Sequence, residues 1–462
     1  MIILCGKLQV CFNIIALLVA IFTISYNMPN CFAFAVTYIL IVGITYVLAK
    51  KILKMIGLPL TEKLTKFSSF CWNTFFWFNF ANILLSMALE STNIFVHAST
   101  GTLLDLFKMM PCVGFLLVSI AKAYKIKRYW SVFENLVMEP RTMWPTGHIT
   151  EEEHKVISDA LGRLKIVLKV YFLCNTMLAS IFTLPSMIAW IKNRTGQDVE
   201  LIFGFSYWLP FDPFQGIRYE IVYFVQTFHC FLSAGFMVCG DLLFCIFLSH
   251  ITTQFSLLAI RINRFLYVPI DDQLVESYTL GKLTVAIAFI KFHTKMNEVV
   301  SAYDSDAEQR YNEEFISIVK KHRALIRLSG DVENMYTFTL LVNFINSSII
   351  ICFCLFCCII EKWNEFNYKI FCLTSILQIW MLCWYGQQLL DTSTGVAEAL
   401  YNCGWYMASK GMKKSVLIMM QRSQNEVYVT TYGFSIVSLD SYATILKTSW
   451  SYFTLLINMY KE

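Results

Sequence analysis

Long apolar stretches alternate with polar connectors along most of this chain. Beyond residue 60 seven such stretches cover residues 67–89, 101–121, 166–191, 217–248, 336–360, 370–390 and 432–459. A helix needs roughly 20 mostly apolar residues to cross about 30 Å of hydrocarbon, so each stretch is long enough to span a membrane. The pattern predicts an all-α membrane protein with seven transmembrane helices.

The basic residues of the connectors predict the orientation of these helices. Connectors 122–165, 250–334 and 391–431 are rich in Lys and Arg, whereas the connectors between them carry few. Because short loops rich in Lys and Arg stay on the cytoplasmic side, we expect these three connectors inside the cell. The topology is then inverted relative to a G-protein-coupled receptor, with the N-terminus cytoplasmic and the C-terminus extracellular.

A glycosylation sequon agrees with this orientation. Asn193, Arg194 and Thr195 form an Asn-X-Thr acceptor in the third connector, which the topology places outside. We therefore expect a glycan on Asn193. A second sequon, at Asn346, lies inside a predicted span, where we expect none.

The membrane topology of residues 1–50 is considered separately from that of residues 51–460. Residues 11–26 and 31–49 are two further apolar stretches, joined by residues 27–30. They either insert as a membrane hairpin, lie in the membrane interface or represent an unusual start of the reading frame. An inserted pair leaves the orientation of all later helices unchanged.

The fourth connector is predicted to be helical. Its apolar residues Phe315, Ile318, Val319, Leu325 and Ile326 recur at helical spacing among charges within residues 308–328. This indicates an amphipathic helix packed on a partner, which residues 275–300 of the same connector would supply; a basic face on anionic lipid is the alternative. We expect cytoplasmic anchor helices within about 250–335 and 391–431.

Composition supports the membrane assignment and argues against several functions. Hydrophobic residues make up 57% of the chain and charged residues only 15%, against about 25% charged in soluble domains. The net charge of +5 is small for 462 residues and gives no indication of nucleic-acid binding. The 16 cysteines and the histidines show no metal-ligand spacing, and no catalytic cluster recurs, so we expect no enzyme activity, cofactor or metal.

The last apolar stretch differs from the others in its polarity. It carries Asp440, Lys447 and a series of Ser and Thr residues within membrane length. Intramembrane charges usually face the interior of a bundle or a water-filled path, and small hydroxylated residues are typical of helix contacts. This helix is therefore predicted to be central in the assembly.

Several segments resemble the insect odorant receptor family. The third connector enters its helix as WLPFDPFQGIRYEIVYFVQ, and the fifth span follows HRALIRLSGDVENMYTFTLL. The sixth span continues into CWYGQQLLDTSTGVAEALYNCGWY, and the end reads MMQRSQNEVYVTTYGFSIVSLDSYATILKTSWSYFTLL, the most specific of these segments. The resemblance extends back to about residue 51, whereas the apolar residues before it depart from the family.

This resemblance implies a ligand-specific channel subunit. Proteins of this family resemble one another in being odorant-gated, non-selective cation channels of olfactory sensory neurons. In them four subunits, usually including a shared co-receptor, surround one pore. The resemblance implies that the last helix lines the pore, that cytoplasmic helices join the subunits, and that the ligand is a small, volatile, hydrophobic molecule. The expected location is the plasma membrane of the dendrite.

The resemblance also suggests which residues form the gate. Leu455, Asn458 and Met459 share one face of the last helix and match the family's gate and neighbouring polar ring. Ordinary packing between helices is the alternative. Asp440 and Lys447 lie two turns apart on one face, where they either border the inner vestibule or form a structural ion pair.

We expect an odorant site in the outer half of the bundle. Such sites are concave and mostly apolar, with few polar groups. Residues placed at that depth, each of which is otherwise plain bundle core, are Phe107, Met110, Met177, Ser180, Ile181, Tyr223, Gln226, Thr227, Gln378, Trp380 and Met381.

Three other functions remain as alternatives. A gustatory receptor of the same superfamily is the nearest, although Thr431 and Tyr432 are not followed by the Gln-Phe pair typical of that class. A G-protein-coupled receptor would have the opposite orientation. A secondary transporter would show Gly- or Pro-broken spans in repeated halves, which the sequence lacks.

Overall fold

The computed structural model describes residues 66–100, 103–144, 149–265, 305–360 and 366–461. All of them belong to one compact unit, Leu53–Glu462. The two apolar stretches predicted within residues 1–50 lie outside the described residues.

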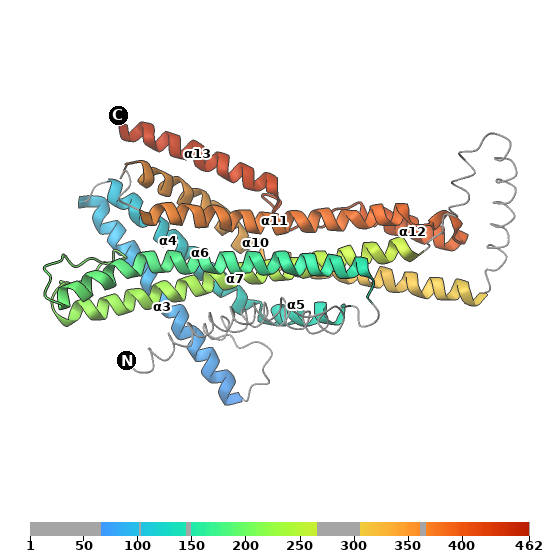
Figure 1. Ribbon diagram of the computed structural model, residues 1–462, viewed down its shortest axis with the longest axis horizontal. Coiled ribbons are helices and arrows are strands. Elements are labelled where there is room, and N and C mark those ends of the chain that lie inside the picture. The colour runs from blue at the N-terminus through green and yellow to red at the C-terminus, as the bar shows by residue number, and fades with distance from the viewer. Residues whose placement is uncertain (1–65, 101–102, 145–148, 266–304, 361–365, 462) are drawn as a thin grey trace. The chain divides into compact units, whose positions relative to one another are not determined.

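Within the described residues, seven long helices form at the seven predicted apolar stretches (Figure 1). They are α3 (Lys66–Thr100), α4 (Leu103–Arg128), α6 (Glu151–Arg194), α7 (Ile217–Phe265), α10 (Ser305–Ile360), α11 (Phe366–Asn402) and α13 (Leu439–Lys461). Shorter helices are α5 (Trp130–Thr142), η1 (Trp405–Met407) and α12 (Lys410–Ser423). The prediction of an all-α protein is confirmed.

Five of these helices, α4, α6, α7, α10 and α11, are long and apolar enough to cross a membrane by length and composition. The helices α3 and α13 are less apolar, because Asn, Ser, Thr and Trp interrupt their apolar residues.

Local sequence signals determine where some of the helices begin and end. Thr150 and Glu153 form a capping box at the start of α6, and Lys192 and Arg194 occupy its last turn.

Helix α7 is the centre of the packing. It contacts α3, α4, α5, α6, α10 and α11. Every residue from Phe236 to Ser249 is buried, so this part of the helix has no exposed face. A helix that is apolar on all sides is typical of a bundle core.

One buried charge in this core is fully partnered. The Asp241 carboxylate accepts a hydrogen bond from Lys122 Nζ at 2.6 Å, from Tyr171 Oη at 2.6 Å and from Gln378 Nε2 at 2.9 Å. These partners come from α4, α6 and α11, so a single side chain of α7 ties four helices together. A buried carboxylate is tolerated only with such partners.

The amphipathic helix predicted within residues 308–328 forms, as the first part of α10 and continuous with the fifth predicted span. Phe315 and Ile318 are buried, and the Phe315 ring lies 5.7 Å from that of Phe265 at the end of α7. The partner is therefore the extension of α7. Residues 275–300, which the sequence also offers as a partner, lie outside the described part of the chain.

Helix α13 begins at Leu439, so the predicted start at residue 432 is wrong. The residues before it fold into a tight turn, closed by an antiparallel bridge between Thr430 and Ile436. Tyr432 and Gly433 both have positive φ, at 55° and 79°, which no residue of a right-handed helix adopts. Hydropathy along the chain does not detect such a turn, because its residues are as apolar as those of the helix.

Contacts with α10 and α11 hold this turn in place. Thr430 Oγ1 donates to Glu333 Oε1 at 2.7 Å, and Tyr432 N donates to Thr337 Oγ1 at 2.6 Å. On α11, Gly386 packs so closely on Val437 that a Cβ atom would collide with the Val437 carbonyl. The start of α13 is thus fixed to two neighbouring helices.

Candidate ligand cavity and pore helix

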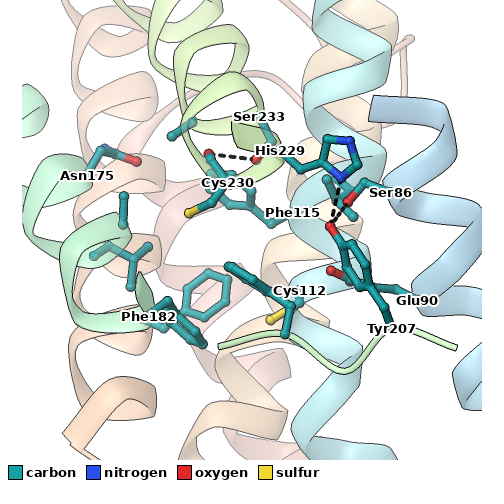
Figure 2. Close-up of a pocket in the computed structure, with 16 residues that line it drawn as sticks. Ser86, Glu90, Cys112, Phe115, Asn175, Phe182, Tyr207, His229, Cys230 and Ser233 are labelled. Atoms are coloured by element: carbon teal, nitrogen blue, oxygen red, sulfur yellow. Dashed lines mark hydrogen bonds between the residues drawn. The ribbon is translucent and has the colours of Figure 1, made fainter. Parts of the chain in front are cut away.

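A partly open cavity of about 50 Å³ lies among α3, α4, α6, α7 and α11 and is closed on one side by the loop between α6 and α7 (Figure 2). A cavity needs roughly 10–15 Å³ to hold one water, so this one has room for several waters or one compact organic molecule. Among the described residues, no group of three or more His, Cys, Asp or Glu side chains is placed to hold a metal ion.

One side of the cavity is aromatic. The Phe182 ring stacks on that of Phe205 at 5.5 Å between centroids, and its edge meets Phe371 at 6.1 Å. Phe115 of α4 meets the same Phe371 ring at 6.0 Å. Rings in such contacts give an apolar ligand a large surface for dispersion.

The other side of the cavity is polar and is supplied by α3, α7 and the loop between α6 and α7. The Tyr207 hydroxyl is hydrogen-bonded to Ser86 Oγ at 2.6 Å and to His229 Nδ1 at 3.0 Å. Glu90 lies on the same side, with only 4% of its surface exposed (Figure 2). The cavity thus combines aromatic walls with a small group of polar atoms.

The loop that closes the cavity is held by specific contacts. Gln226 Nε2 donates to the carbonyl of Phe205 at 2.8 Å, and Tyr219 Oη donates to the carbonyl of Ile202 at 2.8 Å. Gly204 lies so close to the Phe182 carbonyl that a Cβ atom would collide with it. Phe205 and Tyr207 are therefore positioned as wall residues although they lie outside the helices.

A second cavity of about 10 Å³ adjoins the first and shares Phe115, Asn175 and Phe371 with it. It is lined by Tyr171 and Gln378, both of which bond to Asp241. This space is about the size of a single water.

Helix α13 has two distinct faces. The buried face carries Ser441, Ile445, Ser449 and Phe453, which recur every four residues. The exposed face consists of Asp440, Thr444, Lys447, Ser451, Leu455 and Asn458, at steps of three and four residues. Its polar residues thus point away from the helices of this chain.

Helices α10 and α11 contact α13, and its buried face joins a cluster with α10. Phe453 packs with Cys352 and Phe356 of α10, and Phe107 of α4 packs against the same cluster. Phe107 also stacks on Phe353 at 4.9 Å. The C-terminal half of α13 therefore packs on the other described helices from one side only.

The family model of the 7tm odorant receptors matches residues 102–450 of this chain. The chain belongs to the odorant receptor family. This match covers α4 to α12 and the first half of α13, and with them the cavity residues outside α3. Ser86 and Glu90 of α3 precede the matched residues, and Leu455, Asn458 and Met459 follow them. Membership makes the chain a receptor of a ligand-gated channel family and not an enzyme.

Sequence relatives of this odorant receptor are found in Drosophila melanogaster. Odorant receptor 67c is 28% identical over 359 residues, which cover 76% of this chain and 79% of the relative. Odorant receptor 85b is 23% identical over 407 residues, covering 86% and 94%. The similarity thus extends over most of both proteins.

A solved structure shares the fold. The insect olfactory receptor OR5 from Machilis hrabei, determined in complex with eugenol, superposes with a TM-score of 0.72 over 91% of this chain and 99% of its own. The sequences are only 15% identical, so the likeness concerns the fold alone.

The residues predicted for the odorant site lie on helices that border the main cavity, but none of them lines it. Gln378 lines the second cavity, and Gln226 donates a hydrogen bond to the carbonyl of Phe205, a wall residue of the main cavity. The other predicted positions face other parts of the bundle or the outside. Successive residues of a helix point to different faces, and hydropathy does not indicate which face borders a cavity.

The remaining predicted positions have the following surroundings. Met110 and Met177 are exposed, at 36% and 47%, while Tyr223 and Met381 are buried in contacts outside the cavity. Two aromatic residues stack elsewhere, Phe107 on Phe353 and Trp380 on Trp384. Ser180 bonds to its own helix at Thr176, Ile181 is half-buried, and Thr227 Oγ1 is buried without a partner in the described residues.

Sequence reasoning missed the polar side of the cavity. Glu90 is the only Asp, Glu, Lys or Arg between Lys66 and Asp105, which is a signal that could have been used. Tyr207 and His229 gave no such signal, because their pairing depends on how the loop between α6 and α7 folds back onto α7.

The residues predicted for the pore lie on the exposed side of α13. Leu455 and Met459 are 57% and 65% exposed, and Asn458 is exposed beside them. Asp440 and Lys447 are also exposed, and neither joins an ion pair that the described residues form. Asn193 is exposed at the end of α6, where a glycan has room.

Proposed function

We propose that this odorant receptor is an odorant-gated, non-selective cation channel subunit in the plasma membrane of olfactory sensory neurons. It acts as the ligand-specific subunit of a heteromeric tetramer with the odorant co-receptor. Its N-terminus faces the cytoplasm and its C-terminus faces the outside. The cavity then lies in the outer half of the membrane, where a volatile molecule has access to it.

The exposed face of α13 carries this proposal. A membrane helix that directs Asp440, Thr444, Lys447 and Ser451 away from its own bundle requires water or another subunit beside them. Several copies of α13 around a common axis satisfy that requirement, with the polar residues facing a water-filled path. Asp440 and Lys447 then border the inner vestibule.

The outer end of the same face supplies the gate. Leu455 and Met459 side chains converging from several subunits close the path by dewetting, and the Asn458 amides replace part of an ion's hydration shell. Small movements of α13 suffice to separate such side chains, because its outer half packs on its own subunit from one side only.

Ligand binding is coupled to this gate through α10. Asn346 and Ile350 of α10 line the second cavity, and Cys352 and Phe356 of the same helix contact Phe453 of α13. An odorant that binds the open state better than the closed one shifts the population toward opening. The inner parts of α7, α10 and α12 serve as the anchor that joins subunits.

Recording from cells that express the chain with and without an insect odorant co-receptor tests the proposed function. The expected result is an odorant-evoked cation current in cells expressing both chains, with the ligand choice set by this chain; cells with the co-receptor alone are the control. Odorant responses that pass through G proteins without any conductance would contradict it.

A further inference from the structure

Glu90 lines the ligand cavity and has a buried carboxyl oxygen that lacks a hydrogen-bond partner among the described residues. It lies in α3, is 4% exposed, and its Oε2 atom has no hydrogen-bond partner among the described residues. The other polar atoms on that side bond to one another, since the Tyr207 hydroxyl joins Ser86 to His229. Figure 2 shows these side chains grouped on the same side of the cavity.

No Lys or Arg side chain of the cavity compensates this carboxyl, and the histidine that lines it, His229, is bonded to Tyr207. The 16 residues that line it include no Lys or Arg. Lys122, a buried cation of the same bundle, is paired with Asp241 at 2.6 Å. A buried carboxyl without a partner is unfavourable, and buried polar groups are nearly always hydrogen-bonded. Because a carboxyl accepts a hydrogen bond at its carbonyl oxygen whether or not it is protonated, a hydrogen-bond donor is a partner that satisfies it.

The cavity therefore has two unlike ends. Glu90 presents an acceptor at one end, while Phe115, Phe182 and Phe371 form an apolar wall at the other. A compact molecule with an apolar body and one donor matches both ends at once. A purely apolar molecule fills the wall but leaves the carboxyl unpaired, which lowers its affinity.

We propose that this receptor selects small, mostly apolar ligands that carry one hydrogen-bond donor, an O–H or an N–H group, which binds Glu90. The proposal rests on the proposed function, because it assigns the ligand class of the same cavity. Hydroxyl compounds and amines share this chemistry. They differ in charge, so substitution of Glu90 distinguishes them.

The test uses three molecules of one shape: 2-phenylethanol, 2-phenylethylamine and ethylbenzene. Acetophenone, which only accepts hydrogen bonds, is the fourth probe. Two readouts are taken on the full chain, namely current in cells that also express the co-receptor and thermal stabilisation of the purified chain. We expect at least one donor-bearing compound to act at a concentration about tenfold or more below that of ethylbenzene.

Two substitutions locate the effect. Glu90→Gln keeps an acceptor oxygen but removes the charge, so the response to the alcohol is expected to stay within about tenfold while that to the amine is lost. Glu90→Leu is expected to reduce both to the level of ethylbenzene. Glu200→Gln, on the exposed loop that follows α6, is the matched control and leaves the responses unchanged.

The outcomes separate this proposal from the proposed function. If no donor-bearing compound surpasses ethylbenzene and acetophenone in both readouts, or if Glu90→Leu at normal surface expression leaves the preference intact, the ligand assignment is overturned. The comparison of the four probes on the unsubstituted chain needs no variant, so misfolding of a variant does not affect it. Binding that follows the expected order without any current overturns the channel function alone.

Discussion

At the scale of single residues, the Asp241 network decides how the bundle is held together. Asp241 is 2% exposed and bonds to Lys122, Tyr171 and Gln378 on three other helices. Removing one partner of a buried ion pair costs about 3–5 kcal/mol, because the remaining charge stays buried. This network therefore contributes more to the unique packing of the core than any exposed ion pair of the same chain.

Lys122→Met tests this role. We expect a marked loss of thermal stability in detergent, measured by size-exclusion chromatography after heating, because Asp241 loses its cation. The double variant Lys122→Met with Asp241→Asn is expected to recover part of that loss. Lys192→Met, on an exposed position of α6, is the control, and an equal loss in the control would contradict the account.

The sequence identifies polar residues within spans but not their partners. Asp440 and Lys447 are recognisable in the sequence as charges within an apolar stretch, and Glu90 as the charge within a long uncharged stretch. Which face of a helix borders a cavity depends on helix rotation by a fraction of a turn, and this is set by side-chain packing across several helices. For that reason the predicted odorant residues lie on helices that border the main cavity but on faces that do not line it.

At the scale of elements, the turn before α13 fixes where the proposed pore helix starts. The turn bonds to Glu333 and Thr337 of α10, and it lies against Gly386 of α11. The position of α13 therefore depends on a glycine that permits close contact, a feature that hydropathy does not reveal.

Gly386→Ala is expected to displace the start of α13, because the added Cβ collides with the Val437 carbonyl. Odorant-evoked current should be strongly reduced while the protein still reaches the cell surface. Gly395→Ala on the same helix meets nothing within 4 Å and should retain the current. Currents of the same size in both variants would refute a role for this contact.

Phe315→Ala tests the packing of α10 on the extension of α7. Phe315 is 6% exposed and meets Phe265 at 5.7 Å, so its loss is expected to cost about 3–5 kcal/mol. The neighbouring Ile316 is 50% exposed, and Ile316→Ala should change the melting temperature far less. Thermal melts that do not distinguish the two variants would argue against this packing.

The long helices were predictable because membrane-length apolar runs depend on composition alone. The turn over residues 430–438 and the partner of the amphipathic helix were not, since both depend on contacts between distant parts of the chain. Thus the existence of α7 and α10 follows from the sequence, whereas the contact between Phe265 and Phe315 does not.

At the scale of the whole molecule, the orientation in the membrane is a central expectation of the account. Asn193→Gln should remove one glycan, seen as faster migration in a gel and reproduced by glycosidase treatment of the unsubstituted protein. Ser348→Ala, which destroys the sequon inside α10, should cause no shift. An unglycosylated Asn193, together with a C-terminal tag that antibody reaches only after permeabilisation, would contradict the inverted topology.

The central claim is that α13 lines a pore that odorants open, and ion permeability tests it most directly. With the co-receptor present, Asn458→Asp places extra negative charge on the exposed face of α13 and should raise the permeability of Ca²⁺ relative to Na⁺ in the odorant-evoked current. Ser449→Ala on the buried face, whose hydroxyl bonds only to Ile445 of its own helix, should leave the reversal potential unchanged. An odorant-evoked current whose relative permeability is the same in Asn458→Asp and in the unsubstituted receptor would contradict the account.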